Sequence, residues 1–137
     1  GCGMRISAKV DYAIRAMLEL AAAGDFVKGE LLATAQQIPQ KFLENILLDL
    51  RHAELVTSRR GVDGGYSLGR PADEISIADV IRAVEGPIAT VRGARPDDVV
   101  YEGAARALAP LWIELRTAMR AVLEETSLAE LVERART

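Results

Sequence analysis

Apolar residues recur at three- and four-residue steps through the first half of the chain, a spacing typical of amphipathic helices. Ser7 can cap the first helix, which we expect to run to about Ala23. A second helix is predicted over about 29–37. A third begins at Pro39, which suits the first helical position, and reaches about Ala53. Two helices joined by so short a turn predict a helix-turn-helix.

The pattern changes after the third helix. Residues 55–60 have the composition of a strand, and Tyr66-Ser67-Leu68 supplies a matching one. The turn between them contains Asp63-Gly64, a strong signal for a β-hairpin. Three helices followed by a hairpin are the order of a winged helix, in which the third helix enters the DNA major groove and the hairpin flanks it.

The second half of the chain begins with a further helix. Ser76 and Asp79 are placed like a loose capping box at its start, and Gly86-Pro87 ends it. Residues 88–103 show no clear periodicity, and we expect an exposed loop or a frayed segment there. The carboxylate pairs Asp97-Asp98 and Glu124-Glu125 are expected to be solvated charges, because adjacent side chains on a helix point in different directions.

A long helix with an apolar stripe follows this loop, and Pro110 either starts or kinks it. One helix cannot bury such a stripe alone, so we expect the stripe to form an interface with another apolar surface. The residues of this predicted interface are Leu108, Leu111, Trp112, Leu115, Met119 and Val122. Trp112 has a second possible role in an effector pocket, although a tryptophan in such a stripe more often belongs to a core or an interface. A short final helix is predicted over 128–134.

The composition is that of a globular protein. The 137 residues, 50% of them hydrophobic and 27% charged, suit one hydrophobic core. We therefore expect one integrated, mainly α domain with a small β-hairpin. Its winged helix-turn-helix would cover residues 4–86, and the loop, the dimerisation helix and the final helix would cover residues 87–137.

The first residues, the cysteine content and the lengths of the apolar runs bear on the cellular compartment. Gly1-Cys2-Gly3 precede Met4, and this order indicates a remnant ahead of the natural start. The single cysteine allows no internal disulfide, and no apolar run reaches the length of a membrane span. We therefore expect a cytoplasmic protein without a membrane partner.

The net charge of -3 argues against a generic nucleic-acid binder, because such binding needs clustered Lys and Arg facing phosphates. The charge is unevenly distributed, however. Residues 1–72 carry nine Lys or Arg and eight Asp or Glu, whereas residues 73–137 carry eight and twelve. The acidic excess therefore lies outside the predicted winged helix.

Polar side chains stand at the N-terminal end of the predicted third helix, where a recognition helix reaches base edges. They are Gln40, Lys41, Glu44 and Asn45. Glutamine and asparagine can recognise adenine, and glutamate can accept a hydrogen bond from cytosine. The alternative is that these four residues only solvate an exposed helix face.

The predicted hairpin supplies further candidates for DNA contact. Arg59 and Arg60 stand at its base, and Gly64-Gly65 would let its backbone approach phosphates or the minor groove closely, next to Tyr66. An ordinary exposed hairpin is the alternative. Basic side chains that could add phosphate contacts are Arg5, Lys9, Lys41, Arg51, His52 and Arg70.

The sequence contains few of the residue types on which catalysis and metal binding most often depend. His52 is the single histidine and Cys2 the single cysteine, so zinc sites and histidine-dependent triads are excluded as far as the residue types go. We expect no enzyme activity, no metal site and no cofactor.

Several segments together resemble a known family. They are Met4-Arg5-Ile6-Ser7, Asp11-Tyr12-Ala13, the wing segment from Arg60 to Leu68, Ile77-Ala78-Asp79-Val80-Ile81, Glu85-Gly86, Leu111-Trp112 and Ser127 to Val132. In these segments the chain resembles the bacterial Rrf-two (Rrf2) regulators over nearly its whole length from Met4. The resemblance implies a dimer built on the long C-terminal helix, with two winged helices on a near-palindromic operator. It also implies that Lys41, Glu44 and Asn45 contact bases and that Arg60 enters the minor groove.

Many regulators of this family sense iron, nitric oxide or redox state through an iron–sulfur cluster held by three cysteines before the long helix. The corresponding window here, about residues 93–106, contains no cysteine. Asp11 stands where some relatives have a carboxylate ligand, but one oxygen cannot hold a cluster that needs thiolates, and a charge in a first helical turn is the simpler role. The chain resembles the cluster-free branch, which includes a cysteine-metabolism repressor that acts through a partner enzyme.

The sequence therefore predicts a DNA-binding transcriptional regulator, acting as a homodimer and as a repressor. Its signal would arrive through a small-molecule effector, a protein partner or its own concentration. The alternative is a protein-interaction adaptor that binds a partner enzyme through its acidic C-terminal half.

Overall fold

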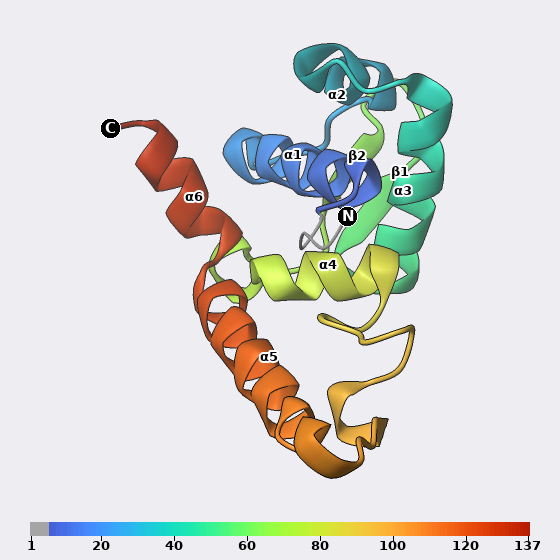
Figure 1. Ribbon diagram of the computed structural model, residues 1–137. Coiled ribbons are helices and arrows are strands. Elements are labelled where there is room, and N and C mark those ends of the chain that lie inside the picture. The colour runs from blue at the N-terminus through green and yellow to red at the C-terminus, as the bar shows by residue number, and fades with distance from the viewer. Residues whose placement is uncertain (1–5) are drawn as a thin grey trace.

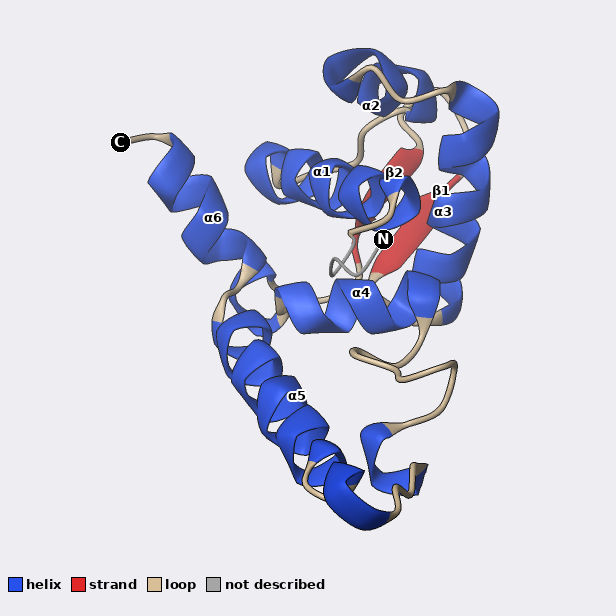
Figure 2. Cartoon of the chain, viewed as in Figure 1, coloured by secondary structure: helices blue, strands red, loops and turns tan. Residues whose placement is uncertain are grey.

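Six α-helices and one two-stranded sheet make up residues 6–137, the part of the chain that the computed structural model describes (Figures 1 and 2). The helices are α1 (Ala8–Ala23), α2 (Gly29–Gln36), α3 (Gln40–His52), α4 (Ile77–Glu85), α5 (Leu108–Glu125) and α6 (Leu128–Ala135). The strands are β1 (Val56–Arg59) and β2 (Gly65–Leu68), and three single turns of 3-10 helix are η1 (Ala72–Glu74), η2 (Pro96–Asp98) and η3 (Gly103–Ala105). The predicted mainly helical fold with one hairpin is confirmed.

Local signals fix the ends of the first three helices. The Ser7 hydroxyl accepts a hydrogen bond from the Val10 N–H, as an N-cap does, and Gly24 ends α1 in the left-handed conformation. Gln37 lies just after α2 with φ 53°, and Pro39 is the cap of α3 rather than its first helical residue. The predicted helices are therefore present, with boundaries shifted by about one residue.

α1 lies at the centre of the core and packs against α2, α3, α4 and α6. Its buried side chains include Met17 and Leu20, which share the core with Ile46 of α3, Val80 of α4 and Leu128 of α6. Leu128 is fully buried although it belongs to the last helix. The C-terminal segment is thus part of the same core as the helix-turn-helix.

β1 and β2 form an antiparallel hairpin in which Val56 pairs with Leu68 and Arg59 pairs with Gly65. Val27 exchanges two backbone hydrogen bonds with Tyr66, both 2.8 Å long, and so adds a third extended segment beside β2. This bridge ties the hairpin to the chain between α1 and α2. The wing is therefore anchored along its inner edge.

The capping box predicted before α4 is present. Ser76 accepts a hydrogen bond from the Asp79 N–H at 3.0 Å, and the Asp79 carboxylate accepts one from the Ser76 N–H at 2.9 Å. Burial raises the pKa of Asp79, but the Ser76 N–H and the Arg82 guanidinium outweigh that effect and leave this pKa below its ordinary value.

The exposed loop predicted over 88–103 is wrong in part. Ile88, Pro96 and Val99 are buried, and η2 packs against α5. Asp97, expected to be solvated, accepts two hydrogen bonds from the Arg116 guanidinium, at 2.9 and 3.1 Å. Apolar residues without helical or strand spacing give no periodic signal. The sequence pattern therefore does not predict that this loop is buried against a distant helix.

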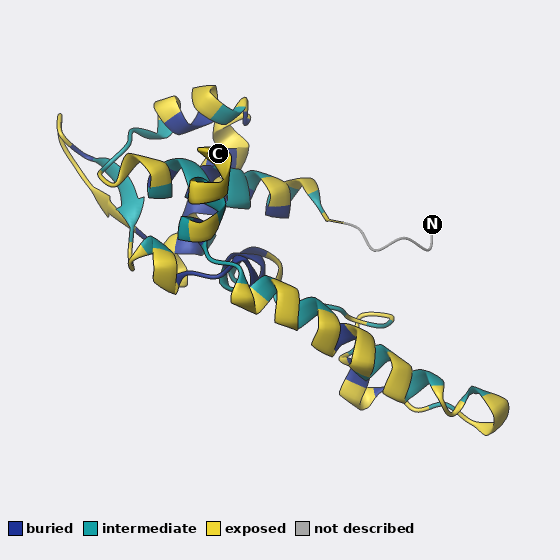
Figure 3. Cartoon of the chain, turned by 90° about the vertical axis from the view of Figure 1, so that its left-hand side faces the viewer, coloured by how far each residue is buried: buried dark blue, intermediate teal, exposed yellow. Residues whose placement is uncertain are grey.

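Glu124, also expected to be solvated, pairs with Arg82 and thereby joins α5 to α4. α5 nevertheless points away from the helix-turn-helix, whereas α6 turns back toward α1 (Figures 1 and 3). Pro110 lies in the first turn of α5, where a missing N–H costs no intrahelical bond. The predicted remnant Gly1-Cys2-Gly3, Met4 and Arg5 lie outside the described residues.

Candidate nucleic-acid interface

α3 has one buried face and one polar face. Leu43, Ile46, Leu47 and Leu50 recur at the helical period and are all buried in the core. On the other side, the four predicted base-contacting residues Gln40, Lys41, Glu44 and Asn45 are all exposed. Within residues 6–137, none of these four side chains hydrogen-bonds to another part of the chain. Their donors and acceptors are therefore available to a ligand.

Two contacts hold α3 in position on α1. The Lys9 ammonium lies 2.8 Å from the Asp49 carboxylate, and the Phe42 ring meets the Tyr12 ring edge-on with 5.6 Å between centroids. These contacts lie near opposite ends of α3, so they fix its orientation as well as its distance from α1. Lys9, which was a candidate for phosphate contact, is thus engaged within the protein.

The two wing arginines have different surroundings. The Arg59 guanidinium stacks on the Phe26 ring, 4.0 Å from its centroid, and donates to the Asp63 carbonyl at 2.7 Å. The Lys28 ammonium donates to the Gly61 carbonyl at 2.6 Å and holds the same turn from the other side. Arg59 therefore shapes the wing, with Phe26 and Lys28 as partners that the sequence pattern did not identify.

Arg60 differs from its neighbour. Its side chain is exposed and has no hydrogen bond or ion pair among the residues that the structure describes. It directly follows β1, where the hairpin turns. Of the two arginines, Arg60 is the one with a free guanidinium.

The two wing glycines are required by contacts inside the protein. A Cβ atom on Gly64 would lie 2.1 Å from the Arg59 carbonyl oxygen, and one on Gly65 would lie 2.5 Å from the Val27 carbonyl oxygen. Tyr66 is half-buried, and its backbone forms the bridge to Val27. These three residues thus set the geometry of the wing, and direct DNA contact by them stays a prediction.

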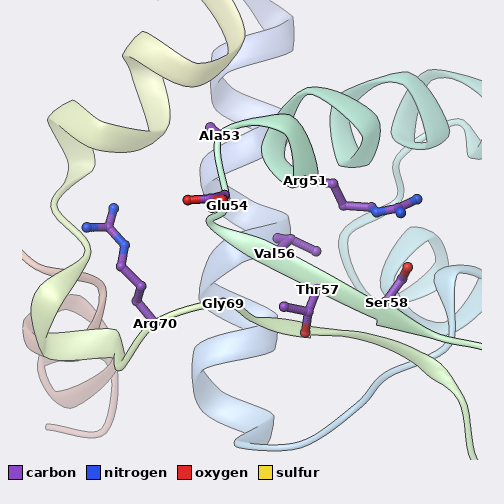
Figure 4. A pocket seen from close by; sticks show the side chains of 8 residues that line it. All are labelled: Arg51, Ala53, Glu54, Val56, Thr57, Ser58, Gly69 and Arg70. Carbon is purple, nitrogen blue, oxygen red and sulfur yellow. The ribbon is translucent and has the colours of Figure 1, made fainter.

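An open hollow lies between the C-terminal end of α3, β1 and the chain after β2 (Figure 4). Arg51 and Arg70 stand on opposite sides of it and extend away from each other. Arg70 also lies 3.8 Å from Asp79. Because the two guanidinium groups do not converge, the hollow does not form a closed anion site. Both arginines, like the exposed His52, remain candidates for phosphate contact.

The predicted dimer face on α5 is divided between two environments. Leu111, Leu115 and Val122 are 48%, 38% and 66% exposed. Met119 packs against the core of its own chain, and Leu108 is half-buried. Trp112 is also half-buried and donates from its indole N–H to the Tyr101 hydroxyl at 3.0 Å. Three apolar side chains on this face thus stay in contact with solvent.

An ion pair between the buried Arg116 and the exposed Asp97 fixes the loop against α5 beside this face. The Arg116 side chain is 9% exposed and binds both carboxylate oxygens of Asp97. Hydrogen bonds from Arg116 lower the pKa of Asp97, and the same bonds raise the pKa of Arg116. This bidentate geometry gives the loop a defined place along the helix.

The residues present do not fit an iron–sulfur cluster held by three cysteines. The sequence contains one cysteine, Cys2, and the described window 93–106 contains none. Among residues 6–137, no group of three or more His, Cys, Asp or Glu side chains is arranged to hold a metal ion. Asp11, in the first turn of α1, pairs with Arg15 at 3.0 Å. Of the described helices, none combines the length and apolar character needed to cross a membrane.

Comparisons with known proteins agree over nearly the whole chain. The Rrf2 family model, described as an iron-dependent transcriptional regulator, matches residues 6–134. The HTH-type transcriptional regulator Rv1287 of Mycobacterium tuberculosis is 53% identical over 130 residues, which are 93% of this chain and 81% of that protein. The regulator CymR of Bacillus subtilis is 38% identical, over 93% of this chain and 89% of its own.

Solved structures show the same relationship. The structure of CymR, described as the global cysteine regulator of B. subtilis, superposes with a TM-score of 0.82 at 34% identity and covers 96% of this chain and 98% of that chain. The IscR structure from T. potens gives a TM-score of 0.79 at 28% identity, over 97% of this chain and 89% of its own. The family and these relatives are transcriptional regulators and not enzymes, as the sequence predicts. The chain belongs to the Rrf2 family of transcriptional regulators.

Proposed function

We propose that this regulator binds operator DNA with α3 in the major groove and with Arg60 of the wing in the adjacent minor groove. The observation that carries the proposal is the polar face of α3, whose four side chains are exposed and unengaged beside a wing held in place by Phe26 and Lys28. A side chain that must pair with a base cannot already be bound within the protein.

The chemistry of the α3 face suits mixed sequences. Gln40 and Asn45 each present an amide that can pair in bidentate fashion with adenine, and Glu44 can accept from the amino group of cytosine. Lys41 can donate to guanine or to a phosphate. We expect Glu44 and Asn45 to control sequence preference and Lys41 to contribute mainly affinity.

The same proposal includes a homodimer formed through α5. Leu111, Leu115 and Val122 lie on one side of this helix and are exposed in the single chain, which favours a second copy as their cover. A two-fold dimer would place two α3 helices on a near-palindromic operator. Such a dimer would act in the cytoplasm, and a dimer on a promoter excludes other proteins from that DNA, so we propose repression.

The signal is proposed to reach the protein without an iron–sulfur cluster. The cysteine content gives no set of thiolates, and in the described residues the loop before α5 is fixed by the Asp97–Arg116 pair. A small-molecule effector, a protein partner or the concentration of the regulator itself are the sources that fit this proposal.

Genome-wide mapping of DNA bound by the epitope-tagged chain tests the proposed function. The wild type is compared with a Glu44→Ala, Asn45→Ala double variant, whose exposed substitutions should leave the fold intact. We expect discrete wild-type sites that share an inverted repeat, and loss of those sites in the variant. Identical maps for both proteins would refute the role of α3. Absence of DNA binding, with a specific enzyme bound through the acidic C-terminal half, would favour an adaptor instead.

A further inference from the structure

The exposed face of α3 carries one large apolar side chain among its polar residues. Leu48 is 47% exposed, whereas Leu43, Ile46, Leu47 and Leu50 of the same helix are 1% exposed or less. At about 100° per residue, Leu48 stands about 140° around the helix from Leu43. This direction is shared by Lys41, Glu44 and Asn45. Leu48 therefore belongs to the proposed DNA-contacting face and not to the core stripe.

Contacts within the chain do not account for Leu48. Phe42, the other exposed apolar residue of α3, meets the Tyr12 ring and helps to hold α3 on α1. Leu48 is absent from the hydrophobic core and from the partly buried residues packed against it in the described part of the chain. A helix face that carries lysine, glutamate and asparagine gains nothing in stability from a solvated leucine.

We propose that Leu48 contacts the C5-methyl group of a thymine in each operator half-site. The proposal rests on the proposed function, because it requires α3 to lie in the major groove. The thymine methyl is the apolar group that the major groove presents. Leu48 follows Glu44 by one helical turn and Asn45 by three residues, so its thymine would lie next to the bases that those side chains contact. Leu48 is then a specificity-determining residue.

The polar side chains around Leu48 favour a DNA base over an apolar protein surface as its partner. Its neighbours on this face are charged or amide side chains, all exposed and unengaged in the described chain. An apolar protein interface would bury those polar groups without partners, which is costly. The major groove offers a hydrogen-bonding edge to each of them and a methyl group to Leu48.

Replacing single thymines by deoxyuridine tests the proposal, since the exchange removes the methyl group and keeps the base pair. Operator duplexes are made with one deoxyuridine at each thymine position in turn, in both half-sites. They are titrated with the full chain as wild type, Leu48→Ala and Leu31→Ala. Leu31 on α2 is 61% exposed and supplies the matched control.

We expect one thymine per half-site at which deoxyuridine weakens wild-type binding about fourfold, the effect of one buried methyl-sized group. The Leu48→Ala protein should bind the unmodified operator about sixteenfold more weakly, because it loses the contact in both half-sites, and it should lose sensitivity at that position alone. The Leu31→Ala protein should behave as the wild type does. Thermal unfolding should be the same for all three proteins, because both leucines are exposed.

Three results would overturn the proposal. The first is a wild-type operator affinity that no deoxyuridine changes, or that changes equally in Leu48→Ala. The second is a Leu48→Ala protein with normal operator affinity but altered self-association, which would assign Leu48 to a protein interface. The third is an absence of specific DNA binding by the wild type, which would refute the proposed function itself and is recognised without any modified base.

Discussion

Arg59 and Arg60 are neighbours in the sequence, but they have different surroundings in the folded chain. Arg59 stacks on Phe26 and bonds to the Asp63 carbonyl, so its charge is committed to the shape of the wing. Arg60 is exposed, with no hydrogen bond or ion pair inside the described residues. A sequence motif with two arginines therefore contains one positioning residue and one residue available to DNA.

The Arg60→Ala variant should lose operator affinity and part of its salt dependence. Removing one DNA-contacting charge from each protomer of a dimer lowers the slope of log affinity against log salt by about 2. The Arg59→Ala variant should lose affinity by loosening the wing, with a smaller change in slope. Titrations over a range of salt concentrations measure both quantities. Arg92→Ala, in the loop before α5, provides a control of equal charge change.

Equal slopes for the wild type and the Arg60→Ala variant would contradict the assignment of Arg60 to the interface. A larger loss of slope in Arg59→Ala than in Arg60→Ala would reverse the roles of the two residues. Both results are differences in slope. A smaller fraction of folded protein would lower the apparent affinity at every salt concentration without changing the slope.

At the scale of elements, the loop from α4 to α5 is fixed by the Asp97–Arg116 pair and by the Trp112–Tyr101 hydrogen bond. Both contacts join the loop to the first half of α5, next to the exposed Leu111 and Leu115. The contacts that hold the loop therefore lie on the same half of α5 as the proposed dimer face. A displacement of the loop should therefore alter that face.

Acid should release this loop. The pKa of Asp97 is lower in the folded chain than the usual value of about 3.9. The pair therefore contributes its full stability above about pH 4, and that contribution is lost as the pH falls through the lower folded pKa. Trp112, the single tryptophan, reports the change by its fluorescence. The emission should be constant from pH 7 to about pH 4 and shift to the red below it.

The Asp97→Asn variant should show the shifted emission of Trp112 already at neutral pH, because Arg116 loses its carboxylate partner. Asp98→Asn, at the exposed neighbouring position, is the matched control and should behave as the wild type does. A spectrum of Asp97→Asn identical to that of the wild type across the whole pH range would show that the pair does not fix the loop.

The elements differ in how far the sequence predicts them. Ser7 and Ser76 cap helices through contacts within three residues, so α1 and α4 could be located from local pattern. Asp97 and Arg116 are 19 residues apart in the sequence, and their pairing depends on where the loop returns to α5. Leu48 is a different case, because the helical period gives its direction from the sequence, whereas its 47% exposure depends on how the folded chain packs.

At the scale of the whole molecule, the helix-turn-helix and α6 share one core, whereas α5 touches that core near its C-terminal end and otherwise extends away from it (Figures 1 and 3). The apolar stripe that the sequence predicts on α5 is real, but Met119 contacts the chain's own core. The remaining exposed side chains, Leu111, Leu115 and Val122, define the surface that a second copy would cover. The homodimer stays a proposal that solution measurements can decide.

A charged residue in place of Leu115 should separate the protomers. In Leu115→Glu two unpaired carboxylates would enter a two-fold interface, and each costs several kcal/mol, so the dimer dissociation constant should rise at least about a hundredfold. Thr117→Glu, exposed on the opposite side of α5, is the matched control and should leave the dimer intact. Sedimentation over a wide concentration range measures both. A Leu115→Glu dimer as tight as the wild type would place the interface elsewhere.

Selection of bound sequences from random duplex DNA by the purified full chain tests whether two protomers bind one operator through α3. We expect one enriched motif of two inverted half-sites, whose centres lie one helical turn or a whole number of turns apart, with about 10–10.5 base pairs in each turn. Two protomers should bind each duplex, and a Lys41→Ala, Glu44→Ala, Asn45→Ala protein should enrich nothing. Failure of the wild type to enrich any motif, or the same motif obtained with the triple variant, would contradict this mode of binding.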